Sequence, residues 1–313
     1  FRHDMVVIDQ QAKHGVEGFA ASLHNTVILP YLVRHGTEEQ KKKYLPKLVS
    51  GELVSAIAMT EPGVGSDLQS VTTTALKDGN GYRINGAKTY ISNGQTADFI
   101  IVVAKTDPNE RAKGISLMLL ETEGAEGFQR GKKLDKIGLD ASDTSELFFD
   151  DVFVPAENVL GGEEGKGFYQ LMGELPQERL IIAMGAMTGI EKALETTLDF
   201  VKNRKAFGQT IWDFQNTQFV MADLKARATA AKIFVNDCIA KHLKRELDVP
   251  TACMAKYWVT ELQGEVVDKC LQFHGGAGFI NDYPIARMYR DSRITRIFGG
   301  SNEVMKMVIA RSM

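Results

Sequence analysis

The sequence has no long apolar run, few cysteines and little net charge. Its 313 residues are 44% hydrophobic and 25% charged, with a formal net charge of -3. No apolar stretch reaches the roughly 20 residues of a membrane-spanning helix, and the balanced charge offers no basic surface for nucleic acid. We therefore expect no stable membrane insertion and no nucleic-acid binding. The composition is typical of a globular protein of roughly two or three domains.

The three cysteines, Cys238, Cys253 and Cys270, lie in helix-like sequence and lack the spacing of metal ligands. We expect reduced core residues in a reducing compartment, and no metal site. The chain starts at Phe1 rather than at a methionine and shows no signal or transit peptide. This predicts a piece of a longer protein.

The first third of the chain changes from helical to alternating periodicity. Helices are expected over residues 4–22 and from Glu38 to Val49, where Thr37 and Gln40 form a capping-box pattern before the break at Ser50-Gly51. The expected strands are Leu53–Thr60, Thr72–Leu76, Tyr82–Ile91, Phe99–Lys105, Ile115–Glu121 and Glu146–Val154. The glycines of Asp78-Gly79-Asn80-Gly81 predict a tight hairpin. Short strands without long helices between them favour a small antiparallel barrel or sandwich.

From Gly167 the periodicity is helical to the C-terminus. Apolar residues recur every three or four positions, at Ile190, Leu194, Leu198 and Val201 and again from Val220 to Val235. Further helices are expected from Thr251, after a break at Pro250, to Phe273, then near Pro284, and from a cap at Ser301 or Asn302 to the end. The predicted class is α+β, mainly helical, with a helical bundle separate from the β region.

The stretch Gly173–Ile182 places an acid at the start of an apolar helix. Pro176 is expected in the first helical turn, followed by the small, apolar run from Leu180 to Met187. Glu178 then lies where a buried interior begins. From position alone, the simpler interpretation is an acid that faces the helix dipole.

Three other stretches combine glycine with polar groups. Ala58–Ser70 is dense in glycine and hydroxyls, and a strand end of this kind permits close approach of a polar ligand, although an ordinary Pro-Gly turn is the alternative. Gln272–Asp282 is a glycine-rich break between helices and lacks the strand of a dinucleotide-binding fingerprint. Arg204-Lys-Ala-Phe207-Gly208 joins cations to an aromatic residue, and its alternative is a solvated helix end.

Together these stretches resemble the acyl-CoA dehydrogenase family over essentially the whole chain. Ala58–Ser70 resembles its first signature, and Gln272 through Asp291, with Arg287, resembles its second. The resemblance implies a truncated N-terminal helical domain (residues 1–54), a middle antiparallel β-barrel or sandwich domain (55–160) and a C-terminal four-helix bundle (161–313). It also implies bound FAD and a homotetramer, or dimer of dimers.

The resemblance assigns FAD-contacting residues by position. Contacts to the flavin ring are implied for Met59, Thr60, Tyr90 and Ser92, and Ser66 is implied to serve both FAD and CoA. The residues implied to hold a neighbouring subunit's FAD are Arg204, Phe207, Gln215, Gln272, Gly275 and Gly276. Ser301 and Glu303 are implied to lie beside FAD, and Phe298 beside the substrate. Each has an alternative as a turn, cap or surface residue.

One position departs from the common family pattern. Most members carry the catalytic glutamate where Phe298-Gly299-Gly300-Ser301 has Gly299. The long-chain and isovaleryl branches carry it on a helix, just before an arginine, and Glu178-Arg179 matches that place. The chain most resembles the long-chain branch. Glu178 is thus the implied base, and Arg179 is implied to place the substrate or orient the base.

The implied reaction converts an acyl-CoA thioester to a trans-2-enoyl-CoA in fatty-acid or branched-acid degradation. Glu178 removes the α-proton, the flavin accepts the β-hydride, and the backbone N–H of Gly299 and an FAD ribityl hydroxyl stabilise the enolate. Electron-transferring flavoprotein is the expected acceptor, in the cytoplasm of a bacterium or the mitochondrial matrix of a eukaryote. The alternatives are an oxidase that uses O2 and a non-catalytic FAD- or acyl-CoA-binding subunit.

Overall fold

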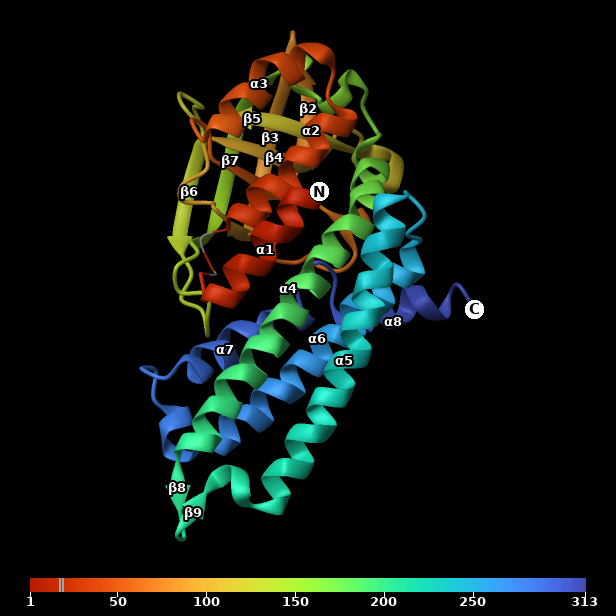
Figure 1. The fold of residues 1–313 in the computed structure, drawn as a ribbon. Helices are drawn as coiled ribbons and strands as arrows, with labels where there is room; N and C mark the ends of the chain where they lie inside the picture. Colours follow the sequence, from red (N-terminus) through yellow and green to blue (C-terminus); the bar gives the residue numbers. More distant parts are fainter. Residues whose placement is uncertain (17, 19) are drawn as a thin grey trace. The chain divides into compact units, whose positions relative to one another are not determined.

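The computed structural model describes residues 1–16, 18 and 20–313 (Figure 1). Its helices are α1 (Arg2–His14), a π-helical turn (Leu23–Ile28), α2 (Leu29–His35), α3 (Glu38–Ser50), α4 (Gly167–Asn203), α5 (Gln215–Leu243), α6 (Val249–His274), α7 (Pro284–Ser292) and α8 (Asn302–Ala310). Its strands are β1 (Ser55–Ala58), β2 (Thr74–Asp78), β3 (Gly81–Ser92), β4 (Phe99–Lys105), β5 (Ile115–Glu121), β6 (Phe128–Lys133), β7 (Thr144–Pro155), β8 (Lys205–Ala206) and β9 (Gln209–Thr210).

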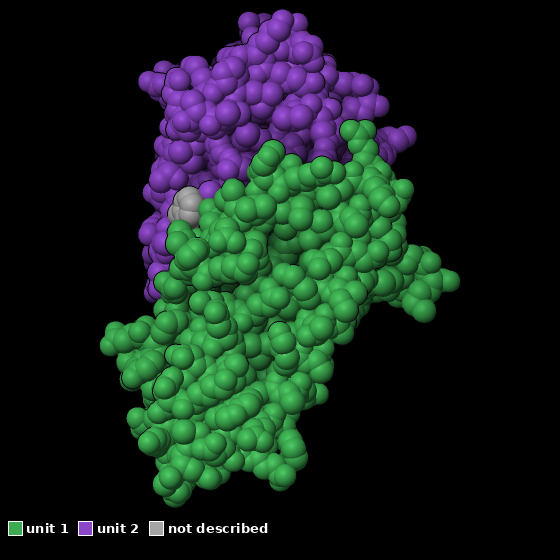
Figure 2. All heavy atoms as spheres, in the orientation of Figure 1, with its two compact units in different colours: residues 1–17, 137–139, 175–313 green, residues 18–136, 140–174 purple. Residues whose placement is uncertain are grey.

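The chain divides into two compact units, coloured separately in Figure 2. One comprises the described residues of 1–17, 137–139 and 175–313, and contains α1, most of α4 and the later helices. The other comprises the described residues of 18–136 and 140–174, and contains the large sheet with α2 and α3. The division falls within α4, between Glu174 and Leu175.

The sheet has seven strands in the order β1-β4-β2-β3-β7-β6, with β5 paired to β4. The expectation of an antiparallel β region is wrong at β4, which pairs in parallel with β1, where Ser55 is opposite Phe99, and with β2, where Thr74 is opposite Lys105. The predicted hairpin is confirmed, with Asp78 opposite Gly81 in the antiparallel pair β2–β3. Strand β6 was not expected, since its sequence Phe-Gln-Arg-Gly-Lys-Lys has almost no apolar residues to mark it.

The central strand β4 is buried on both faces. Ile100, Val102 and Ala104 belong to the core on one face of the sheet. The alternate residues Phe99, Ile101 and Val103 pack with α2 and α3 on the other. Successive side chains of a strand point to opposite faces, so a strand covered on both sides is apolar throughout. That apolar run is why the predicted bounds of β4 are confirmed.

The helices α2 and α3 cover the second face of this sheet. Thr37 accepts a hydrogen bond from the backbone N–H of Gln40, and the Gln40 side chain accepts one from the N–H of Thr37, which confirms the predicted capping box. The Gln40 amide also donates to the carbonyl oxygens of Glu157 and Val159. The capping residue therefore also fixes the chain that leaves β7. Of the first expected helix, residues 4–14 lie in α1, which ends at His14, and residues 17 and 19 lie outside the described part.

The other unit is built around the long helices α4, α5 and α6, which run side by side in Figure 1. Their small and apolar residues share one core, including Ala183, Ile190, Ala231 and Val259. The prediction that Pro176 opens a helix is wrong, because α4 already begins at Gly167 and Pro176 lies inside it. The helix expected from about Thr251 begins at Val249, so Pro250 lies in its first turn and not before it, and Asp248 is its cap. Ser301 is the predicted cap of α8.

Candidate active site

The loop that leaves β1 carries Met59 and Thr60 and is held by β3. The Lys88 ammonium donates a hydrogen bond to the carbonyl oxygen of Met59 at 3.0 Å. The backbone N–H of Thr89 donates to the carbonyl oxygen of Thr60 at 2.9 Å. Two predicted flavin contacts, Tyr90 and Ser92, follow within the same strand. The end of β1 and the end of β3 therefore bring four predicted cofactor residues together.

A buried ion pair that the sequence did not reveal closes this loop. Glu61 accepts from the backbone N–H groups of Thr72 and Thr73 and lies 2.9 Å from the Lys88 ammonium. Burial alone would raise the pKa of Glu61, but Lys88 and the threonine donors lower it to about 2. Burial lowers the pKa of Lys88 to about 8. Both groups are thus charged near neutral pH, and residues 61–73 form a loop tied at its base.

The tip of this loop is open. Ser66 is exposed, and a Cβ built on Gly63 or Gly65 would meet no atom within 4 Å. Tyr90 is 68% exposed and has a φ of 60°, where β3 has an irregular register between Lys88 and Ile91. Polar groups on open backbone are the chemistry that a nucleotide cofactor requires.

In the helical unit, Glu178 and Gly299 are linked through one side chain. Glu178 is buried on α4, and Ile182 follows one turn later on the same helix face. A Cβ added to Gly299 would collide with the Cδ1 methyl of Ile182. The turn of Phe298 to Ser301 therefore lies against the helix that carries Glu178. Gly299 also has a φ of 65°, a conformation that favours glycine.

Arg179 is buried beside the same turn. Its Nη1 group donates to the Sγ atom of Cys253 at 3.3 Å. A Cβ on Gly300 would lie 3.9 Å from the Nη2 atom of Arg179. Within the described part of the chain, the Nε atom of Arg179 is buried without a hydrogen-bond partner. A buried guanidinium donor in this state suits a polar ligand that approaches the turn.

The residues around the turn have separate local roles. The Ser301 hydroxyl accepts from the backbone N–H of Val304 and caps α8. Glu303 is exposed, and hydrogen bonds from its own backbone N–H and from Ser301 lower the pKa of its carboxyl. Phe298 is 41% exposed. Glu174, an acid one turn before Glu178 in the sequence, is instead paired with Arg34 and His35.

The remaining predicted cofactor residues lie at the other end of the bundle. The ring of Phe200 stacks on that of His274 at 4.2 Å, which places the end of α4 beside the end of α6. Arg204 follows Phe200 by one turn, and Gly275 follows His274 directly. The exposed predicted residues here are Arg204, Phe207, Gln215, Gln272, Gly275 and Gly276. The part of α4 from Glu178 to Asn203 is about 38 Å long at 1.5 Å per residue, so these residues lie far from Glu178 and Gly299.

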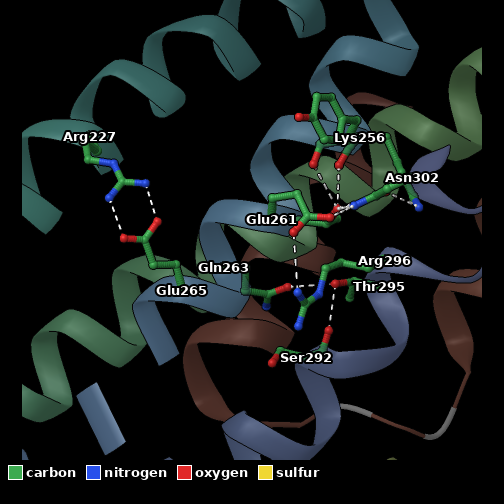
Figure 3. Close-up of polar contacts among 11 residues, drawn as sticks. Arg227, Lys256, Glu261, Gln263, Glu265, Ser292, Thr295, Arg296 and Asn302 are labelled. Atoms are coloured by element: carbon green, nitrogen blue, oxygen red, sulfur yellow. Dashed lines mark hydrogen bonds and ion pairs between the residues drawn. The ribbon is translucent and has the colours of Figure 1, made fainter. Parts of the chain in front are cut away.

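None of the predicted residues lines the cavity of about 580 Å³ in this unit. Its walls include Arg227, Trp258, Glu261 and Tyr289. Arg227 forms a two-pronged ion pair with Glu265, which lowers the pKa of that carboxyl to about 2 (Figure 3). Arg296 pairs with Glu261 in the same wall. Glu261 and Glu265 in the wall thus pair with these cations.

Three family models match the chain in succession. They describe the acyl-CoA dehydrogenase N-terminal domain over residues 1–52, the middle domain over 56–152 and the C-terminal domain over 165–313. The chain belongs to the acyl-CoA dehydrogenase family. It is an oxidoreductase that acts on CH–CH donors, dehydrogenates acyl-CoA thioesters with FAD, and takes part in fatty-acid metabolism.

Relatives agree with this identification. The chain is 49% identical over 310 residues to a mitochondrial long-chain specific acyl-CoA dehydrogenase of Sus scrofa, covering 98% of this chain and 72% of the relative. It is 40% identical to a mitochondrial isovaleryl-CoA dehydrogenase of Pongo abelii, over 99% of this chain and 73% of that one. A crystal structure of an acyl-CoA dehydrogenase from Geobacillus kaustophilus matches with a TM-score of 0.96 and 47% identity, covering 99% and 81% of the two chains.

The residues of this acyl-CoA dehydrogenase suit FAD chemically. In the sheet unit, open glycines and the exposed Ser66 hydroxyl adjoin the tied loop end at Thr60. In the helical unit, a Cβ on Gly275 or Gly276 would meet no atom within 4 Å, so these glycines leave room for a ligand. Among the helices of the described residues, none combines the length and hydropathy of a membrane span.

Proposed function

We propose that Glu178 is the catalytic base of this acyl-CoA dehydrogenase. The observation that carries the proposal is the contact of Ile182 with Gly299. Because Ile182 follows Glu178 by four residues, the turn lies within about 6 Å of Glu178 along the axis of α4. Of the other two acids to consider, Glu174 is paired with Arg34 and His35, and Glu303 on α8 is exposed.

In the proposed reaction, helix α4 supplies the base and the turn at Gly299 supplies a hydrogen-bond donor. The Glu178 carboxylate takes the α-proton of the thioester, and the backbone N–H of Gly299 donates a hydrogen bond to the thioester oxygen as negative charge develops there. Burial of Glu178 excludes water, which would compete for that proton. FAD, when bound, accepts the hydride from the β-carbon. Arg179 and Phe298 contact the substrate, and Arg179 orients the base or the thioester.

We propose that the sheet unit holds the flavin ring of FAD. Met59, Thr60, Tyr90 and Ser92 would contact the ring, and Ser66 would serve FAD and CoA. These residues are held by the hydrogen bonds from Lys88 and Thr89, so their backbone is fixed before a ligand arrives. Ser301 and Glu303 would lie beside FAD at the start of α8.

A second set of residues would hold the FAD of a neighbouring subunit. This set comprises Arg204, Phe207, Gln215, Gln272, Gly275 and Gly276. The roughly 38 Å of helix between Glu178 and Asn203 separates this set from the proposed base, which supports two different cofactors for the two ends. Phe207 is 97% exposed at the tip of the β8–β9 hairpin, as a residue that contacts a partner would be. We therefore propose a homotetramer or dimer of dimers.

We also propose the bounds of three domains, the electron acceptor, the substrate class and the compartment. We assign an N-terminal helical domain to residues 1–54, a β-barrel or sandwich domain to 55–160 and a four-helix bundle to 161–313. The family resemblance supports electron-transferring flavoprotein as acceptor. The Sus scrofa relative supports a long-chain substrate, and the compartment would be the mitochondrial matrix in a eukaryote or the cytoplasm in a bacterium.

The test of the proposed base is Glu178→Gln, which keeps size but cannot accept the proton. We expect the rate of flavin reduction by a long-chain acyl-CoA to fall by about 10² to 10⁴ while FAD content is unchanged. Glu195→Gln is the matched control, because Glu195 is on α4 but forms an exposed pair with Lys192. A near-native rate in Glu178→Gln would reject the assignment. Comparing long-chain and isovaleryl thioesters tests the substrate class.

A further inference from the structure

Lys256 is a fully buried lysine beside the turn that contains Gly299. It lies on α6, with 0% of its side chain exposed. Its ammonium donates to the carbonyl oxygen of Gly300 at 2.8 Å. It also donates to the Oδ1 atom of Asn302 at 2.8 Å, and both of these residues are drawn in Figure 3. Both acceptors belong to the connection between the turn and α8. One side chain thus joins α6 to the backbone next to Gly299.

The turn itself needs such a restraint. Gly299 and Gly300 have φ values of 65° and 91°, and two consecutive glycines leave the backbone free to adopt many other conformations. The carbonyl of Gly300 and the N–H of Gly299 belong to adjacent residues. A cation that fixes the carbonyl therefore also limits how the N–H can point.

The acceptor Asn302 is fixed in turn. Its amide donates to the Thr260 hydroxyl at 3.0 Å and to the Oε1 atom of Glu261 at 2.7 Å. Glu261 also pairs with Arg296 at 3.4 Å, beyond the end of α7. Figure 3 shows these side chains in a continuous series. The series ties the start of α8 to one face of α6.

A buried lysine is costly, and stability alone does not account for it. Burial lowers the pKa of Lys256 to about 8, and Arg179 on α4 contributes to that shift. Glu261 and Cys253 on α6 and Glu303 on α8 oppose it. Well-packed apolar side chains often replace buried charges without loss of stability. The simpler explanation for a buried charge at this position is that it holds the turn in one conformation.

We propose that Lys256 is a positioning residue for dehydrogenation, which holds the Gly299–Gly300 turn so that the Gly299 N–H points at the thioester oxygen. This inference rests on the proposed role of Gly299. Lys256 touches neither substrate nor cofactor in this role. It acts through the Gly300 carbonyl and through Asn302, so its loss should affect enolate stabilisation more than acyl-CoA binding.

The test compares Lys256→Met with Gln263→Met in the FAD-loaded protein. Gln263 lies two turns later on the same face of α6, is also buried, and bonds Thr295 rather than the turn. For Lys256→Met we expect a 10- to 100-fold slower flavin reduction, with a change in acyl-CoA Kd below about threefold. A second readout is the pKa of a bound 3-oxoacyl-CoA, whose enolate absorbs in the near ultraviolet. It should rise by about one unit or more.

Gln263→Met should lose comparable thermal stability yet keep the native rate and the native pKa of the bound 3-oxoacyl-CoA. A native rate of flavin reduction and a native pKa of the bound 3-oxoacyl-CoA in Lys256→Met would overturn the inference. Equal changes of both quantities in Gln263→Met would also overturn it. If Lys256→Met does not fold, Lys256→Gln replaces it, because the shorter amide cannot reach both acceptors, and native values there count equally against the proposal. The 3-oxoacyl-CoA titration does not require a base, so failure of the Glu178 assignment is detected separately by Glu178→Gln.

Discussion

The Cδ1 methyl of Ile182 occupies the space that a side chain at Gly299 would need. A side chain at residue 299 would therefore force the Ile182 methyl to move. Glu178, the proposed base, stands one helical turn before Ile182 on the same helix. Ile182 therefore lies next to both Gly299 and the helical turn that carries Glu178.

Gly299→Ala should test this contact directly. The left-handed φ costs about 1 kcal/mol for alanine, and the collision with Ile182 adds about 1–3 kcal/mol. Ile182→Val removes the colliding methyl, so the double variant should be less destabilised than the sum of the two single variants. Chemical denaturation of all four proteins measures this coupling.

The matched control for this cycle is Gly51→Ala. Gly51 also has a positive φ, of 77°, but an added Cβ would meet no atom within 4 Å. Gly51→Ala should lose only the conformational part, about 1 kcal/mol, with no coupling to Ile182→Val. Strict additivity of Gly299→Ala and Ile182→Val would show that the contact does not exclude a side chain.

The Glu61–Lys88 pair should make the protein sensitive to acid. The folded pKa of Glu61, about 2, is below its ordinary value of 4.5. Its contribution to stability is therefore complete above pH 4.5 and is lost as the pH falls through 2, an effect on the order of 3 kcal/mol. Thermal melts of the native protein and Glu61→Gln between pH 7 and pH 2 should converge at the acid end.

At pH 7, Glu61→Gln leaves the buried Lys88 ammonium without its carboxylate and should cost about 3–5 kcal/mol. The double variant Glu61→Gln with Lys88→Met should be more stable than Glu61→Gln alone, because no charge remains buried. If the double variant is the less stable of the two, the unpaired charge of Lys88 is not the origin of the lost stability.

Local sequence rules predicted those parts of the fold that local interactions determine. The Asp78–Gly81 hairpin and the bounds of β4 and β5 were predicted correctly, because glycine turns and uninterrupted apolar runs have few other interpretations. Pro176 was misplaced because a proline favours a helix start locally, whereas packing along α4 carries the helix through it.

The polar supports of the site were missed for a physical reason. Glu61 and Lys88 are far apart in the sequence, and no local pattern pairs them. Lys256 did leave a signal, because it falls on the apolar stripe of α6 between Cys253 and Val259, where an exposed lysine would not be expected. Periodicity can mark such a residue as buried, but it cannot name the carbonyl that it binds.

Arg204→Ala should weaken FAD retention in the assembled protein. A charge-assisted hydrogen bond contributes about 1.5–3 kcal/mol, so the Kd for FAD should rise about 10- to 100-fold. Lys205→Ala, which removes the adjacent exposed cation in the same hairpin, is the control and should retain FAD. Flavin absorbance after gel filtration gives both results, and equal retention in the two variants would contradict the proposed cofactor contact.

The complete burial of Lys88 and Lys256 also has a chemical consequence. Acyl-CoA thioesters are acylating agents, and a lysine amine with a pKa near 8 is more nucleophilic at neutral pH than an ordinary surface lysine. Enclosure within hydrogen bonds keeps both amines from reagents in solution. They should therefore stay unmodified while surface lysines slowly acquire acyl groups, and become modified only in molecules that have opened.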